Sequence, residues 1–166
     1  MQKRIYSLLV DNTAGVLSRV AGMFSRRGYN IDSLTVGETA DSRFSRMTVC
    51  CSGDDRILEQ IEKQLAKLVD VRDIKVLKPG ESVVHEVVMI KVKVKPEQRQ
   101  GVLSIADIFR AKIVDVSMDS LIVEMTGSQS KLSAFIDLLR DYEILELART
   151  GMTGLSRGSE DVRFLQ

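Results

Sequence analysis

The sequence Gly15-Val16-Leu17-Ser18 recurs further along the chain as Gly101-Val102-Leu103-Ser104. In both places an apolar, strand-like run precedes the glycine, and an apolar stripe with helical spacing follows it. Outward from these two points, each half of the chain shows the same order of predicted elements, which is β-α-β-β-α-β. Such a repeat predicts two related units rather than one large domain.

The first half carries four predicted strands, over residues 5–10, 31–36, 47–51 and 71–77. Its first helix begins near Gly15 and ends at Gly28. The apolar stripes of the two helices are Val16, Leu17, Val20 and Phe24, then Ile57, Ile61, Leu65 and Leu68. Ile5 and Leu9 place apolar side chains on the sheet face away from the helices. That face is therefore expected to be buried against another copy or another domain.

The second half contains the clearest alternating segment, over residues 88–94, with one apolar face and one face rich in lysine. Further strands are predicted over 113–118, 120–125 and 143–148. The helical stripes are Val102, Ile105, Ile108 and Phe109, then Leu132, Phe135, Ile136 and Leu139. The lysine face could contact an acidic partner, but solvation of an outer sheet face is the favoured interpretation.

The predicted fold is α+β, with two ferredoxin-like βαββαβ domains in tandem. In each half, helices with one apolar stripe pack on one face of an antiparallel sheet and bury both surfaces. We predict a first domain over residues 1–78, a linker over 79–84, a second domain over 85–158 and a tail over 159–166.

Composition predicts an ordinary globular protein of the cytoplasm. The 166 residues are 44% hydrophobic and 28% charged, with a formal net charge of +1, so nothing drives the chain toward nucleic acid or an anionic membrane. The N-terminus shows neither a signal peptide nor an apolar run that could cross a bilayer. Cys50 and Cys51 are strand neighbours that point to opposite faces, so both are expected to be reduced.

No catalytic constellation and no metal site are predicted. His85 is the one histidine of the chain, and the P-loop, C-x-x-C and G-x-S-x-G motifs are missing. A group of arginines could contact phosphate, but ordinary surface and helix-end roles are favoured for Arg19, Arg26, Arg27, Arg43 and Arg46. The seven methionines are interpreted as core residues.

The informative segment is residues 11–17, where a strand ends and a helix begins around Gly15. Free N–H groups at a helix start attract an anion such as a carboxylate, and glycine allows its close approach. The Asn12 amide can both donate and accept, which suits a zwitterion. The alternative is that Asn12 only caps the turn and Gly15 only makes it tight. Taken alone, this segment favours that structural alternative.

Four stretches resemble the small, regulatory subunit of acetolactate synthase (acetohydroxyacid synthase), with its N-terminal ACT domain. They are DNTAGVLSRV at 11–20, RGYNIDSLTV at 27–36, SRMTV at 45–49 and the tail GLSRG at 154–158. Residues 60–71 and the segment IFR at 108–110 add to the match. The resemblance covers almost the whole chain and is most specific in the first half.

The resemblance implies a non-catalytic regulatory subunit of branched-chain amino acid biosynthesis, including isoleucine biosynthesis. The partner large subunit would carry thiamine diphosphate, FAD and Mg²⁺, whereas this chain would hold no cofactor. As in the family, the chain would activate the large subunit and confer allosteric feedback inhibition by valine. The effector would bind at the interface of a homodimer of ACT domains.

The effector residues that carry over from the family are Asn12, Gly15, Val16 and Leu17 of one chain, with Asn30 and Ile31 of the other. The helix start would take the valine carboxylate, and the two asparagines would contact its ammonium group. The apolar members of this set would hold the isopropyl group of valine. An apolar pocket distinguishes ligands with neighbouring aliphatic side chains by only about 1–3 kcal/mol of binding free energy per methylene.

Two other functions compete with this one. A stand-alone tandem ACT sensor could control another enzyme or gene expression. An enzyme with a ferredoxin-like fold is disfavoured because the catalytic groups are missing.

Overall fold

The computed structural model of the chain describes residues 1–159. Its internal contacts divide the chain into two units. The first comprises Met1–Val83 together with the described chain from Met152 onward, and the second comprises Val84–Gly151. The segment after Gly151 therefore groups with the first unit, whereas we predicted it within a second domain over 85–158. Apart from its first residue, the predicted tail 159–166 lies outside the described residues.

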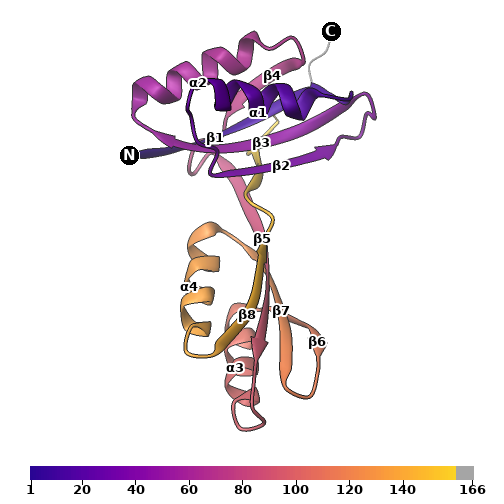
Figure 1. Cartoon of the computed structure of the whole chain (residues 1–166), viewed down its shortest axis with the longest axis vertical. Coiled ribbons are helices and arrows are strands. Elements are labelled where there is room, and N and C mark those ends of the chain that lie inside the picture. Colours follow the sequence, from indigo (N-terminus) through magenta and orange to yellow (C-terminus); the bar gives the residue numbers. More distant parts are fainter. Residues whose placement is uncertain (160–166) are drawn as a thin grey trace. The chain divides into compact units, whose positions relative to one another are not determined.

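The first unit has the predicted β-α-β-β-α-β order. Its elements are β1 (Gln2–Asp11), α1 (Val16–Arg26), β2 (Ser33–Glu38), β3 (Phe44–Gly53), α2 (Asp55–Lys67) and β4 (Val71–Val76). The strands form an antiparallel sheet in the order β2-β3-β1-β4, and both helices lie on one of its faces (Figure 1). This order, with β1 and β3 in the centre, is the ferredoxin-like arrangement.

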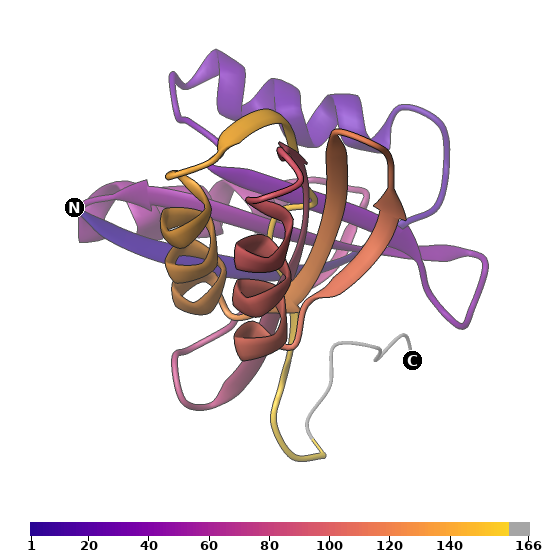
Figure 2. The same ribbon diagram turned by 90° about the horizontal axis from the view of Figure 1, so that it is seen from below.

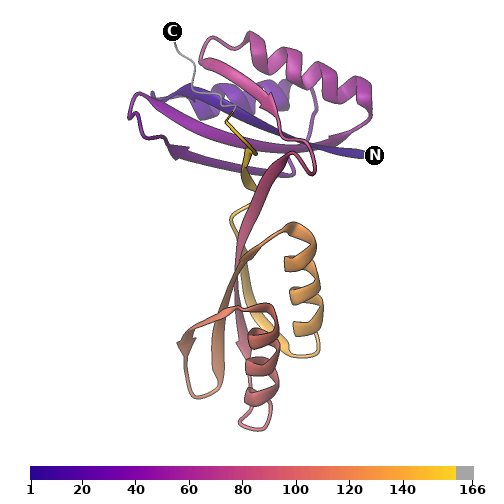
Figure 3. The ribbon, with the colours of Figure 1, turned by 180° about the vertical axis from the view of Figure 1, so that it is seen from behind.

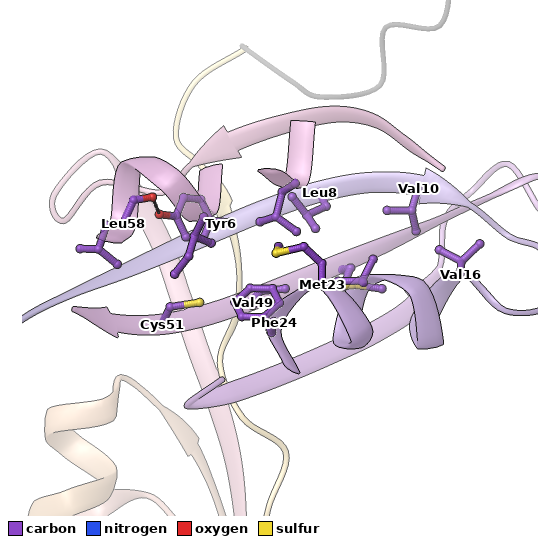
Figure 4. Close-up of a cluster of buried hydrophobic side chains, with 13 residues drawn as sticks. Tyr6, Leu8, Val10, Val16, Met23, Phe24, Val49, Cys51 and Leu58 are labelled. Atoms are coloured by element: carbon purple, nitrogen blue, oxygen red, sulfur yellow. Dashed lines mark hydrogen bonds between the residues drawn. The ribbon is translucent and has the colours of Figure 1, made fainter. Parts of the chain in front are cut away.

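Alternation along β1 builds the core of this unit. Tyr6 and Leu8 point toward the helices and are fully buried, where they meet Phe24 of α1 and Leu58 of α2 (Figure 4). The Tyr6 hydroxyl donates a hydrogen bond of 2.6 Å to the Leu58 carbonyl, so the polar end of this buried ring is satisfied. Burial raises the pKa of Tyr6 to about 12.

The second unit repeats the same order. Its elements are β5 (Ser82–Lys93), α3 (Arg99–Phe109), β6 (Lys112–Val116), β7 (Ser120–Gly127), α4 (Gln129–Leu139) and β8 (Glu143–Arg149). The sheet order is β6-β7-β5-β8, and α3 and α4 lie side by side (Figure 2). Because β5 begins at Ser82, half of the predicted linker 79–84 belongs to a strand.

The core of the second unit corrects one prediction. Val102 and Ala106 of α3 are buried, and the rings of Phe109 and Phe135 lie 5.3 Å apart. Ile108, which we placed in the apolar stripe of α3, is 75% exposed. Steps of four and three residues from Val102 lead to Ala106 and Phe109, so Ile108 falls on the outer side of the helix.

Part of the outer face of the first sheet is buried. Leu9 and Cys50 point away from the helices, and they are 3% and 0% exposed. Met152, which follows β8 along the chain, hydrogen-bonds to Ser33 and Thr35 of β2 on the same face. The segment after β8 is the yellow end of the ribbon that runs along the first sheet (Figure 3). A further strand, β9 (Thr153–Ser156), pairs with β5 and was not predicted. The outer face is thus partly covered by the chain's own later segment.

Both cysteines are free and buried. Cys51 faces the core between the sheet and helices, and burial raises its pKa to about 12. Among residues 1–159, no helix is long and apolar enough to cross a membrane.

Candidate functional site

The loop between β1 and α1 leaves the start of α1 open. Gly15 is the N-cap residue and has a φ of 88°, a left-handed conformation that favours glycine. No side chain of the described residues caps this helix. The first N–H groups of a helix have no partner within it, so those of α1 are available to an anion.

Asn12 precedes this helix start by a few residues, and hydrogen bonds hold its side-chain amide in place. Its Nδ2 donates to the Ser42 carbonyl at 2.9 Å and more weakly to Glu38 Oε2 at 3.4 Å, and its backbone N–H donates to the Arg43 carbonyl at 2.8 Å. The two side-chain bonds use the amide nitrogen, so within residues 1–159 the side-chain oxygen of Asn12 is left to accept a hydrogen bond.

The two apolar residues after Gly15 have different roles. Val16 is 4% exposed and belongs to the core of the first unit, so its side chain offers almost no surface to a ligand. Its backbone N–H belongs to the open first turn. Leu17 is 48% exposed and is the apolar side chain available at this helix start.

Asn30 and Ile31 lie beyond the other end of α1. Asn30 is exposed and donates from Nδ2 to Asp32 Oδ1 at 3.3 Å, while Ile31 packs partly against the core. Helix α1 has 11 residues, which corresponds to roughly 16 Å at the usual rise. Within one chain, the structure therefore does not bring Asn30 and Ile31 to Gly15.

Arg19 is a neighbour of the helix start that we did not predict to belong to the site. Its Nη1 would lie 2.7 Å from a Cβ atom placed on Gly15. Asp70, which is buried, holds the guanidinium through bonds of 2.5 Å to Nε and 3.0 Å to Nη2. The spacing of four residues from Gly15 along one helix face could have pointed to Arg19.

Of the arginines considered for a phosphate site, Arg43 and Arg46 each bind a different partner. Arg43 binds Asp41 through both carboxylate oxygens, which lowers the pKa of Asp41 to about 2. Arg46 donates to the Ser7 hydroxyl at 2.9 Å. Among the described residues there is also no group of three or more metal-ligating side chains.

Hydrogen bonding to Arg19 holds the pKa of Asp70 below its ordinary value, and this predicts loss of stability in acid. Such a carboxylate stabilises the fold fully above the unfolded aspartate pKa of about 4, and the contribution disappears as pH falls through the lowered folded pKa. In thermal unfolding measured from about pH 5 downward, Asp70→Asn should be less stable than the wild type at the upper end, and the two curves should converge in acid.

Asp137→Asn is the matched control because Asp137 is an exposed carboxyl whose ion pair with Arg140 lies within the surface of α4. Because an exposed ion pair contributes little, its removal should change stability only slightly at the upper end of the pH range. Parallel curves for Asp70→Asn would show that the Arg19–Asp70 pair does not stabilise the start of α1.

The repeated sequence at residues 101–104 does not form an equivalent open helix start. Helix α3 begins at Arg99, so Gly101 lies within its first turn rather than at its N-cap. The Tyr142 hydroxyl occupies the space where a Cβ atom of Gly101 would lie. The glycine therefore serves the packing of Tyr142 in the second unit.

Comparisons with known proteins agree across the chain. The family described as the small subunit of acetolactate synthase matches residues 85–158, and the AHAS small subunit-like ACT domain matches residues 6–73. The probable acetolactate synthase small subunit of Methanothermobacter thermautotrophicus is 51% identical over 156 residues, or 93% of each chain. The acetolactate synthase isozyme 3 small subunit of Escherichia coli is 46% identical over 162 residues, covering 97% of this chain and 99% of that protein.

A solved structure gives the same result. The crystal structure of the acetolactate synthase small subunit from Thermotoga maritima superposes with a TM-score of 0.88 at 41% identity, covering 96% of this chain and 100% of the other. Similarity of this extent covers both units and the segment after them. The chain therefore belongs to the acetolactate synthase small subunit family, with an ACT-type first domain.

Proposed function

We propose that this chain binds valine at the start of α1 and thereby controls an acetolactate synthase large subunit. The observation that carries the proposal is the uncapped, glycine-opened start of α1 with the oriented Asn12 amide beside it. Family membership supplies the context, because relatives named as small subunits imply a catalytic partner. In this proposal the chain carries no catalytic group or cofactor of its own.

The carboxylate of valine would bind the open N–H groups at residues 15–17. The helix dipole favours a negative charge there, and the missing side chain of Gly15 lets the ligand approach the backbone. The Arg19 guanidinium adds a positive charge next to Gly15. Because Asp70 holds Arg19 in place, this charge needs little reorganisation when the ligand arrives.

The ammonium group of valine needs acceptors, and these support the choice of an amino acid over a simple carboxylic acid. The free side-chain oxygen of Asn12 is one acceptor, and the carboxylate of Glu38 lies near the same amide. The exposed Leu17 side chain would contact the isopropyl group. A zwitterion with an aliphatic side chain matches this combination of groups.

Asn30 and Ile31 can join this site only from a second copy of the chain. Strand β2 lies at the edge of the sheet and runs from Ser33 to Glu38, so its last residue lies near Asn12. Antiparallel pairing of two β2 edges would place the first residues of the partner's strand beside Glu38. The partner's Asn30, three residues before that strand, would then reach the ligand. We therefore propose a homodimer with the effector at its seam.

Feedback inhibition requires that valine prefer one of two states of the complex with the large subunit, because equal affinity for both would shift nothing. The direct test mixes the chain with an acetolactate synthase large subunit and measures acetolactate formation with and without valine. We expect the chain to raise activity and valine to reduce it. A chain that neither activates nor confers valine sensitivity would instead support the stand-alone sensor.

Asn30→Ala should weaken valine binding by about 1–3 kcal/mol, because the polar ligand group that it contacts would be left unsatisfied. Isothermal titration calorimetry with valine measures the change. Gln100→Ala is the control, since it removes an exposed amide from the second unit. If Asn30→Ala binds valine as tightly as the control, Asn30 does not contact the ligand.

A further inference from the structure

The tail sequence GLSRG at 154–158 has no place in the effector site, and the structure gives it a different location. The segment from Met152 onward groups with the first unit, although it follows β8 of the second. Gly151, with a φ of 87°, turns the chain at this boundary. Beyond the turn, β9 pairs with β5, and the Arg157 N–H donates to the Glu81 carbonyl at 2.8 Å.

Met152 attaches this segment to β2. Its backbone N–H donates to Ser33 Oγ at 3.4 Å, and its carbonyl accepts from Thr35 Oγ1 at 3.3 Å. Its side chain is 5% exposed, so it is buried. Both hydrogen bonds are longer than the usual range, so they can be made or lost at small cost.

The sheet face next to this attachment contains a buried hydroxyl group that lacks a hydrogen bond among the described residues. Thr35 pairs with Thr48 across β2 and β3, so both side chains lie on the face away from the helices. Thr48 Oγ1 is buried and has no hydrogen-bond partner among the described residues. A buried hydroxyl without a partner destabilises the arrangement that contains it. One buried hydroxyl next to the attachment is therefore unpaired among the described residues.

The attachment lies close in sequence to the proposed effector residues. Ser33 is two residues after Ile31, and three residues after Asn30. A ligand that fixes residues 30 and 31 also restricts the start of β2, which carries the two hydroxyl groups that hold Met152. Ordering of one site can change the affinity of another through a shared element of this kind.

We propose that residues 151–157 form a strap whose hold on β2 tightens when valine binds. Because the strap continues directly from β8, it would transmit the state of the effector site to the second unit. The inference rests on the proposed valine site and adds to it a route by which the signal leaves that site. Thermodynamic reciprocity then requires that a loosened strap weaken valine binding by the same factor by which valine tightens the strap.

Hydrogen exchange of the full chain tests the strap, with calorimetry on the same samples. Saturating valine should slow exchange of the backbone amides of residues 152–157 by at least about fivefold, the lower end of usual coupling. Met152→Ala removes the buried side chain of the strap, so exchange there should be faster and the valine Kd should rise by a similar factor. Leu155→Ala is the matched control, because Leu155 lies in the same strap and is 59% exposed.

Thr35→Val provides a second variant that leaves the strap sequence intact and removes one of its hydrogen bonds. It should raise both the exchange rate and the Kd, as Met152→Ala does. If valine binds the wild type but leaves exchange of 152–157 unchanged, the strap inference is wrong and the valine site stands. If valine produces no binding heat in the wild type, the effector proposal fails and the strap inference fails with it.

Discussion

Replacing Gly15 with aspartate is expected to abolish inhibition by valine while the chain still activates the large subunit. The new carboxylate would lie at the open start of α1, where the ligand carboxylate is proposed to bind, and would pair with Arg19 in its place. We expect valine affinity to fall by at least about a hundredfold, which corresponds to roughly 2.7 kcal/mol. Calorimetry and inhibition assays of the reconstituted complex measure the two effects.

The control for this variant is Gly80→Asp. Gly80 also has a positive φ, of 80°, and no atom lies within 4 Å of the position that its Cβ would take. It lies in the turn between β4 and β5, away from the helix start. Gly80→Asp therefore introduces the same charge and a similar backbone strain without touching the site. Normal valine inhibition in Gly15→Asp, or equal loss in Gly80→Asp, would contradict the site.

Phe135→Ala is expected to destabilise the second unit by about 3–5 kcal/mol, the usual cost of removing a buried phenyl ring. Phe135 is fully buried in a core formed by residues of the second unit and stacks at a tilt on Phe109. The first unit has a core of its own. Chemical denaturation followed by circular dichroism should show one early transition while the first unit unfolds near its normal midpoint.

Leu138→Ala tests the same helix at a solvent-facing position. Leu138 is 47% exposed, so its truncation should change stability by less than about 0.5 kcal/mol. Valine calorimetry on Phe135→Ala, in conditions where only the second unit is unfolded, should still register binding. A single transition that shifts as a whole would show that the two cores unfold together.

The order of the elements was predictable because apolar spacing differs between strands and helices. The alternation around Ile90 and the helical stripe around Phe135 each specify an element and its buried face, and the structure confirms both. Ile108 was misplaced because several registers of an apolar helix fit the same sequence. In the structure, the side of α3 that is buried is the one that carries Val102 and Ala106.

The strap and its strand β9 could not be predicted in this way. The segment is four residues long and rich in small residues, and its pairing depends on β5, which lies far away in sequence. Its bonds to Ser33 and Thr35 likewise span more than a hundred residues. Local patterns contain no information about such pairings.

The candidate site was predictable in part. A strand end, a glycine and a helix start at residues 11–17 pointed to the opening that the structure contains. The partnership of Arg19 with Asp70 was not visible, because the two residues come from separate elements. That the Val16 side chain belongs to the core also depends on packing.

The most direct test of the valine site is a crystal structure of the chain grown with valine. We expect the valine carboxylate within about 3 Å of backbone nitrogens at residues 15–17. Its ammonium group should lie against Asn12, and Asn30 of a second copy should close the site. A structure with valine bound elsewhere and the start of α1 empty would contradict the proposal.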